Sequence, residues 1–137
     1  MTGNPPKILV IKSDISELKN VEVFVNEIFT ECNIESKYFN KVYLCISEAV
    51  INSIEHGNKY DKNKKVSIIA GYEKSRLNIE VKDEGKGFNL KLVEDPTTSE
   101  NRKKESGRGI FIIKSLSKQI EYNKKGNSIH FKIECSE

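Results

Sequence analysis

The sequence predicts an α+β two-layer sandwich, in which about three helices cover one face of a mixed, mostly antiparallel sheet of about five strands. Three observations lead to this fold class. The first half of the chain holds two segments whose apolar residues recur with the 3.6-residue period of a helix. Two pairs of alternating apolar segments follow, each joined by a short polar turn typical of a hairpin. The 137 residues contain no repeat or linker, so we expect a single domain over residues 1–137.

The N-terminal part predicts a strand followed by a helix. Ile8–Ile11 is a short apolar run between two prolines and Ser13-Asp14, which is typical of a strand. Asp14 and, three residues later, Glu17 resemble a capping box at a helix start. That helix should end near Cys32-Asn33, and its expected core-facing residues are Ile15, Leu18, Val21, Val25 and Ile28.

The apolar period predicts a second helix from about Tyr38. It should end at Gly57, because glycine is common where helices end. Glu48 and Asn52 lie one turn apart on its outer side, so their side chains converge. Leu44, Cys45 and Ile51 flank this pair, and we therefore expect that side to be partly covered. The residues expected on the core-facing stripe are Phe39, Val42, Tyr43, Ile46, Val50 and Ile54.

The second half of the chain predicts two antiparallel hairpins. Val66–Tyr72 and Arg76–Lys82 form the first, and the second of these strands alternates cleanly between apolar and polar residues. Gln119–Asn123 and Ser128–Glu134 form the other hairpin at the end of the chain. These four strands and the N-terminal one make up the expected sheet.

The segment between the hairpins has a different character. Residues 89–106 show no periodicity, and so long a stretch inside a compact domain is typical of a functional lid or of a disordered segment. Gly107-Arg108-Gly109 then opens an apolar helix from Ile110 to about Ser117.

Composition narrows the functional class. A net charge of +3 with scattered lysines and no interleaved aromatics argues against a nucleic-acid-binding surface. No apolar run is long enough for a membrane span and no signal-peptide pattern is present, so we expect a cytoplasmic protein. The three cysteines are far apart and lack CxxC spacing, which predicts reduced thiols and neither a disulfide framework nor a zinc site.

Three motifs could carry chemistry, and each also has a purely structural interpretation. Glu48 and Asn52 could be a base and a metal ligand in a half-covered cleft, or a surface pair on an ordinary amphipathic helix. Asp83 directly follows a strand, where a rigid carboxylate can accept a hydrogen bond from the exocyclic amine of adenine, while guanine presents a carbonyl there. The glycines at 85 and 87 let a ligand approach the backbone, although a polar turn with two glycines would look the same.

The third motif is Gly107-Arg108-Gly109, at the start of a predicted helix. Unpaired N–H groups and the helix dipole favour an anion there, so phosphate oxygens could bind, although a hinge before a core helix is the alternative. The basic run 102–104, which starts with Arg102, could neutralise a terminal phosphate or could be a solvated charge run.

The order and spacing of these motifs resemble those of the GHKL (Bergerat-fold) ATP-binding family. The matching features are a Glu-xxx-Asn helix that ends His-Gly, a hairpin that leads into DxGxG, a lid over about residues 89–106, and a GxG that opens a helix. The resemblance covers nearly the whole chain. Within the family the chain looks most like the anti-sigma factor serine/threonine kinases of bacterial partner-switching systems, since other branches carry the module beside further large domains.

The resemblance implies a Bergerat ATP-binding fold, ATP and Mg²⁺ as cofactors, and a set of residue roles. Glu48 would be the catalytic general base and Asn52 the magnesium ligand. Asp83 would bind the adenine amino group, and Ser128 stands where relatives often have a threonine near the adenine. The glycines expected to shape the adenine pocket or to hold phosphates are Gly85, Gly87, Gly107 and Gly109, together with Arg108.

The chain also departs from the family pattern. Many relatives have a basic residue just before the Ser-Gly at the end of the lid, where this chain has Glu105. The cation that reaches the γ-phosphate is therefore open, with Arg102 and Arg108 as candidates. The acidic residues common after the last helix are replaced around Ser117-Lys118-Gln119, which affects the expected partner surface.

Two functions of different class follow from the resemblance. In the first, the protein is an ATP-dependent kinase that phosphorylates a Ser or Thr of an anti-anti-sigma (STAS-type) partner and sequesters a sigma factor, as a homodimer. In the second, it is a nucleotide-gated sequestration module with little or no kinase activity. A slow stand-alone ATPase is a third interpretation. The intact Glu48 favours the kinase.

Overall fold

The computed structural model describes residues 5–85, 112–123 and 127–136. The described residues form one five-stranded sheet with the strand order β1-β2-β3-β5-β4. The strands are β1 (Lys7–Lys12), β2 (Lys65–Glu73), β3 (Arg76–Lys82), β4 (Lys118–Tyr122) and β5 (Ser128–Glu134). Two long helices, α1 (Leu18–Glu31) and α2 (Phe39–Asn52), lie between β1 and β2 in the sequence.

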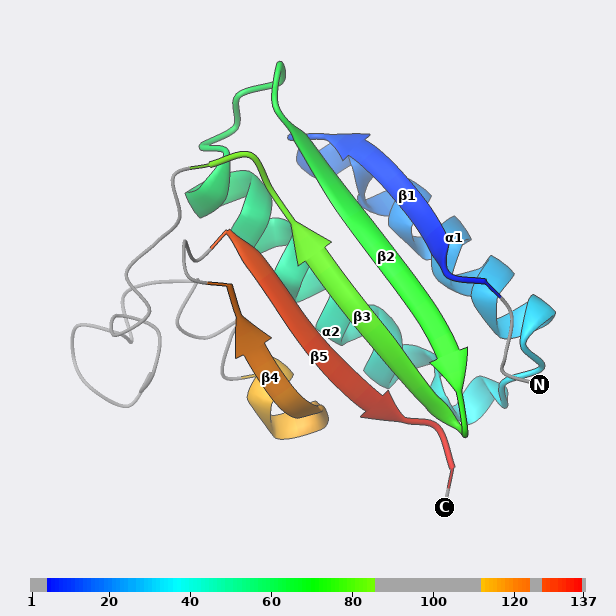
Figure 1. Cartoon of the computed structure of the whole chain (residues 1–137). Helices are drawn as coiled ribbons and strands as arrows, with labels where there is room; N and C mark the ends of the chain where they lie inside the picture. The colour runs from blue at the N-terminus through cyan, green and yellow to red at the C-terminus, as the bar shows by residue number, and fades with distance from the viewer. Residues whose placement is uncertain (1–4, 86–111, 124–126, 137) are drawn as a thin grey trace.

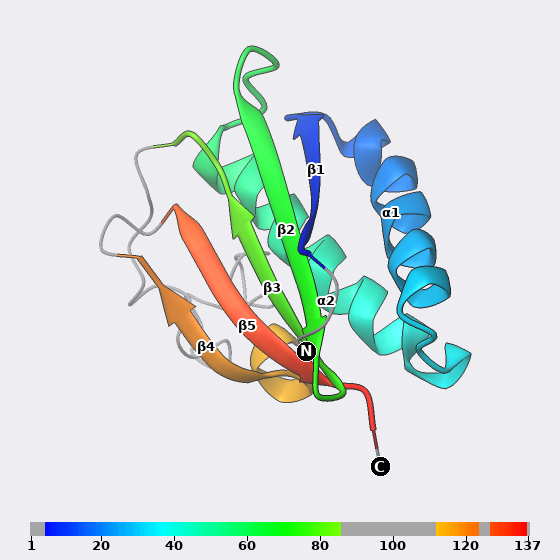
Figure 2. The ribbon, with the colours of Figure 1, turned by 45° about the vertical axis from the view of Figure 1, so that its right-hand side comes forward.

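The helices cover one face of the sheet, as the sequence predicts. In Figure 1, α1 lies behind β1 and α2 lies behind the centre of the sheet, and the turned view in Figure 2 shows α1 to the side of β1 with α2 behind the strands. The short helix 112–116 adds the fully buried Ile113 to the same core. The predicted α+β two-layer sandwich is confirmed. All four strand pairs are antiparallel, however, so the described part of the sheet is not mixed.

The alternation of β2, β3 and β5 assigns each of their residues to one of the two sheet faces. Leu77, Ile79 and Val81 of β3 are fully buried against the helices, as predicted, and Ile79 pairs with Phe131 of β5. The intervening polar residues lie on the face that carries no helix. This register fixes which side chains at the strand ends turn towards α2.

Helix α1 follows the prediction except in its first turn. Asp14 caps that turn by accepting a hydrogen bond from the Ser16 amide at 3.0 Å. Residues Ile15–Glu17 form a 3-10 helix, and its tighter winding leaves Ile15 38% exposed. The prediction that Ile15 faces the core is therefore wrong. Asn33, just beyond the helix, has a φ of 57°, which is typical of a residue that terminates a helix.

Helix α2 has the predicted buried stripe and ends in a π-turn. Val42, Ile46, Val50 and Ile54 have no exposed surface. The final segment Ser53–Gly57 is π-helical, a form that occurs as single turns and often at functional sites. The helical stretch thus ends at the predicted Gly57, but the residues with left-handed backbone are Lys59 and Tyr60, with φ of 53° and 62°.

The remaining features concern the cysteines and the membrane. Cys32, Cys45 and Cys135 are free, as predicted, and burial raises the pKa of Cys45 to about 12 and that of Cys135 to about 11. Both of these thiols are therefore protonated near neutral pH.

In the part of the chain that the structure describes, no helix combines the length and apolar character needed to span a bilayer.

Candidate functional site

The predicted base and metal ligand lie in the last two turns of α2. Glu48 is half-buried, whereas Asn52, one turn later, is only 5% exposed. The amide nitrogen of the Asn52 side chain is buried and has no hydrogen-bond partner among the described residues. An unpaired buried amide is costly, so a site where one persists is a candidate for ligand contact.

The predicted adenine-binding carboxylate follows β3 directly. Asp83 is 3% exposed, and its Oδ1 accepts a hydrogen bond from the Gly85 amide at 2.7 Å. Its own amide donates to the carbonyl oxygen of Asn127 at 2.9 Å, which joins the end of β3 to the start of β5. The Asp83 side chain is thus held by a tight turn and a rigid strand end.

These residues meet in one small pocket between the end of α2 and the ends of β3 and β5. Asn52 approaches it from the helix, Asp83 from β3 and Ser128 from β5. Its volume of about 10 Å³ is roughly that of one water molecule. The other lining residues are Ala49, Ser53, Val81, Asn127 and Ile129. Three of the predicted site residues, which lie far apart in the sequence, are therefore neighbours in space.

Two glycines make this close packing possible. A Cβ atom at Gly57 would lie 2.1 Å from Oδ2 of Asp83, and a Cβ atom at Gly85 would lie 1.9 Å from the carbonyl oxygen of Gly57. Both separations are far below van der Waals contact, and neither backbone can move away without disturbing the strand end. The π-turn and the Asp83 turn consequently require glycine at both positions.

The residues also fit a magnesium ion bound through a nucleotide. Among the described residues, no cluster of three or more His, Cys, Asp or Glu side chains could hold a metal by itself. Magnesium prefers oxygen ligands, retains several waters and is often bound through one or two protein oxygens and substrate phosphates. The Asn52 carboxamide, beside the carboxylate of Glu48 on the same helix, is compatible with that arrangement.

Comparison with known proteins identifies the family. Residues 11–133 match the family described as the histidine kinase-like ATPase domain. The chain belongs to this family. The matched region runs from the end of β1 into β5, so it includes all the residues that line the small pocket.

The similar proteins of this family include bacterial anti-sigma factors and kinases. Anti-sigma F factor of Clostridium acetobutylicum is 33% identical over 116 residues, which cover 77% of this chain and 80% of that protein. Serine-protein kinase RsbW of Bacillus subtilis is 30% identical over 83 residues, or 56% of this chain. The matched segment spans only about half of RsbW, 52% of its length.

Solved structures agree on the fold. The structure of the RsbU and RsbW domains of Rv1364c from Mycobacterium tuberculosis has a TM-score of 0.64 at 15% identity, and the match covers 95% of this chain and 32% of that one. The catalytic domain of the histidine kinase ThkA has a TM-score of 0.54 at 16% identity over 94% of this chain and 97% of that domain. At these identities the likeness concerns the fold alone, and it confirms the predicted GHKL-type architecture.

The side chains of Ser128 and of the preceding Asn127 make hydrogen bonds to different partners. It lines the pocket, but its hydroxyl donates a hydrogen bond to Glu80 of β3 at 2.8 Å, on the polar face of the sheet. Asn127, one residue earlier, is buried and directs its side-chain amide towards the carbonyl oxygens of Asp83 and Gly85, each at 3.4 Å. The contact between Ser128 and the adenine stays a prediction.

Sequence reasoning missed the buried asparagines beside the pocket. Asn58, directly after the π-turn, is 1% exposed, and Asn127 is 8% exposed. Both stand next to a glycine in the sequence, in the His-Gly-Asn and Gly-Asn-Ser segments, where asparagine is easily taken for a polar turn residue. The signal that could have identified them is an asparagine next to a glycine, directly after a predicted helix or directly before a predicted strand.

Several predicted site residues lie outside the described residues. They are the lid at about 89–106 and the residues Gly87, Arg102, Gly107, Arg108 and Gly109. Their assigned roles remain predictions.

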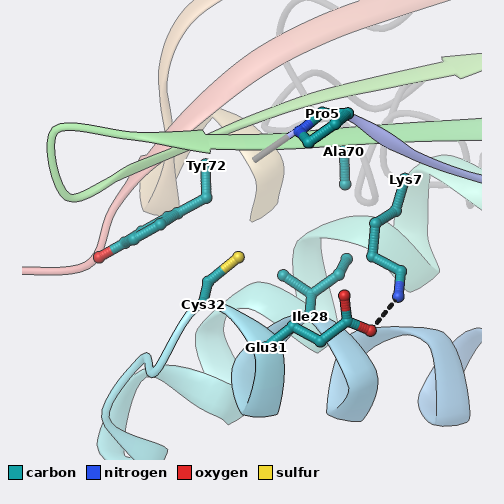
Figure 3. Close-up of a pocket in the computed structure, with 7 residues that line it drawn as sticks. All are labelled: Pro5, Lys7, Ile28, Glu31, Cys32, Ala70 and Tyr72. Carbon is teal, nitrogen blue, oxygen red and sulfur yellow. Dashed lines mark hydrogen bonds and ion pairs between the residues drawn. The ribbon is translucent and has the colours of Figure 1, made fainter. Parts of the chain in front are cut away.

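A much larger cavity lies at the other end of the sheet, away from all the predicted site residues. It has a volume of about 490 Å³ and lies between the end of α1 and the strands β1 and β2. Figure 3 shows its lining, in which Lys7 and Glu31 form an ion pair and Cys32 and Tyr72 lie to one side of that pair. The hydrogen bond to the Glu31 carboxylate raises the pKa of Lys7 above its ordinary value, so the Lys7 ammonium is charged near neutral pH.

Proposed function

We propose that this protein is an ATP-dependent serine/threonine kinase that phosphorylates an anti-anti-sigma (STAS-type) partner and sequesters a sigma factor. The observation that carries the proposal is that Asn52 of α2 and Asp83 after β3 line one pocket, with Glu48 one turn before Asn52. The names of the similar proteins, serine-protein kinase RsbW and anti-sigma F factor, support the same role. Residues 1–137 would act as one ATP-binding domain, as a homodimer in the cytoplasm.

Each residue has a distinct task in the proposed reaction. Asp83 accepts a hydrogen bond from the exocyclic amine of adenine and so places the base. Asn52 supplies an oxygen ligand to Mg²⁺, which neutralises charge on the phosphates when it is bound. Glu48 takes the proton of the incoming Ser or Thr hydroxyl as that oxygen attacks the γ-phosphorus, and ADP leaves. Positioning and charge neutralisation provide most of the rate in such transfers.

Labelled ATP distinguishes this proposal from the alternatives. The protein is incubated with γ-labelled ATP, Mg²⁺ and a candidate STAS-type protein, and the label is located by gel and by mass spectrometry. We expect label on one Ser or Thr of the partner, and none when that residue is replaced by alanine. Tight ATP binding without label on the partner would replace the kinase with the nucleotide-gated sequestration module. Release of free phosphate alone would favour the slow ATPase.

A further inference from the structure

Asn58 is a buried polar side chain near the pocket, and both its amide nitrogen and its amide oxygen are hydrogen-bonded. Its Nδ2 donates to Oγ of Ser13 at 2.7 Å and to the carbonyl oxygen of Lys65 at 3.0 Å. Its Oδ1 accepts the amide proton of Glu84 at 2.9 Å. Its backbone amide donates to the carbonyl oxygen of Ser53 in the π-turn at 2.8 Å. One residue thus connects four segments: the turn after β1, the end of α2, the start of β2 and the Asp83 turn.

The residues around Asn58 make the connection rigid. Gly57, directly before it, packs so tightly on Asp83 that no side chain fits between them. The Glu84 carboxylate accepts a hydrogen bond from the amide of Lys65, which ties the same turn to β2 a second time. Ser13, which is fully buried, donates its hydroxyl hydrogen bond to the carbonyl oxygen of Lys64 at 2.8 Å. The Asp83 turn therefore cannot shift without breaking bonds to both β2 and the helix end.

We propose that Asn58 is a positioning residue that sets the distance between the Glu48–Asn52 helix and the Asp83 turn. This inference rests on the proposed function, because it assigns the two ends of one nucleotide to these two segments. A single nucleotide must meet Asp83 with its base and the helix with its phosphates at the same time. The Oδ1 bond to the Glu84 amide is the contact that acts on the turn, and the two Nδ2 bonds anchor Asn58 to the scaffold.

Three variants separate these two groups of bonds. N58A removes all of the side-chain bonds and leaves the Glu84 amide without its partner. N58D keeps an acceptor for the Glu84 amide but places a carboxylate against the Lys65 carbonyl, so it should be the less stable of the two. S13A removes one of the two Nδ2 bonds together with the bond from Ser13 to the Lys64 carbonyl, and it leaves the Glu84 bond intact, which makes it the matched control.

The measurements are the affinities for ATP and GTP by calorimetry, at a temperature where circular dichroism shows each variant to be folded. We expect N58A to bind ATP about 10-fold more weakly, the scale of one lost hydrogen bond to a buried amide. Its preference for ATP over GTP should shrink by a similar factor, because the turn that carries the Asp83 carboxylate has then lost its bond to Asn58 and is held less firmly. N58D and S13A should keep the preference and bind ATP within about 3-fold of the wild type.

The order of ATP affinities among the variants decides whether Asn58 positions the turn. The proposal requires N58D to bind ATP better than N58A although it is the less stable protein, an order that a merely structural role would reverse. Unchanged ATP affinity and base preference in N58A would overturn it, and so would an equal loss in S13A. If neither variant of Asn58 folds, loss of the base preference in S13A overturns the proposal, and its retention in S13A supports it. A wild-type protein that ignores ATP would instead reject the proposed function itself.

Discussion

The cavities near the two ends of β3 differ in volume and in the chemistry of their lining. At its C-terminal end, the buried Asp83 and Asn127 line a pocket of about 10 Å³, and the buried Asn58 accepts a hydrogen bond from the turn that follows Asp83. At its N-terminal end the chain turns back in the β2–β3 hairpin, beside a cavity of about 490 Å³. The charged side chains in that cavity, Lys7 and Glu31, are partly exposed and form an ion pair with each other.

The difference shows that volume is the poorer guide to function here. Both charged side chains that line the larger cavity are neutralised by each other, so a ligand would have to compete with that pair. The smaller pocket contains a buried amide nitrogen without a partner among the described residues, next to a buried carboxylate. Burying such groups costs free energy unless a ligand or a network compensates for it. Variants at the two ends should therefore have different effects.

The largest effect is expected from Glu48→Ala at the pocket end. Loss of a general base should lower the rate of phosphoryl transfer by about 10²–10⁴-fold. ATP affinity should be kept, because Glu48 is half-buried on the helix and Asp83 and Asn52 remain. Transfer is measured by labelled phosphate on the partner protein and affinity by calorimetry. Glu22→Ala on the exposed side of α1 is the control, and an unchanged transfer rate in the Glu48 variant would remove this residue from the role of base.

The next effect is on stability, from Gly85→Ala. The added Cβ would lie 1.9 Å from a backbone carbonyl oxygen, so the end of β3 or the π-turn must move. We expect a loss of about 3 kcal/mol in the free energy of unfolding, measured by urea denaturation. Gly71→Ala in β2 is the matched control, because its Cβ would come no closer than 4.0 Å to the nearest atom, in Pro6. Equal stability of the two variants would mean that the pocket end is not tightly packed.

A smaller effect on binding is expected from Asp83→Asn. A charge-assisted hydrogen bond to the adenine amine would become a neutral one, which should weaken ATP binding by about 1.5–3 kcal/mol. The exposed Glu73, at the hairpin end of β2, provides the control: Glu73→Gln removes the same charge far from the pocket. Calorimetry that finds equal ATP affinity in the Asp83 variant and the wild type would show that this carboxylate does not bind the base.

Much of the fold can be predicted from local patterns. The apolar period of α2 and the alternation of β3 depend on nearby residues, and both are confirmed together with the α+β class. The prediction for Ile15 is wrong because the capping signal at Asp14 marks where a helix begins but does not say that the first turn is 3-10. The parallel component expected of a mixed sheet is missing from the described strands, because pairing between distant strands is not encoded locally.

The site is less accessible to sequence reasoning. Asn52 and Asp83 can be identified because glycine and strand ends accompany them, and the structure places both at one pocket. Asn58 and Asn127 act through bonds to backbone atoms of segments far away in the sequence, 26 residues in the case of Asn58 and Glu84. Such bonds depend on the tertiary structure alone. The same reason explains why the sequence marks Gly57 as a helix end and not as the residue on which Asp83 packs.

The smallest effect is expected at the hairpin end, and it should be a gain. The turn residues Lys74 and Ser75 have φ of 53° and 65°, the left-handed backbone of a two-residue type I′ turn. Neither is a residue that favours this conformation, so the double substitution Lys74→Asn, Ser75→Gly should raise the free energy of unfolding by about 1 kcal/mol. Ser67→Gly in the extended part of β2 is the control and should lower it by about 0.5–1 kcal/mol. Urea denaturation measures both. ATP affinity should be the same in both variants as in the wild type, because the turn is at the opposite end of β3 from Asp83, and a change there would mean that the two ends are coupled through the sheet.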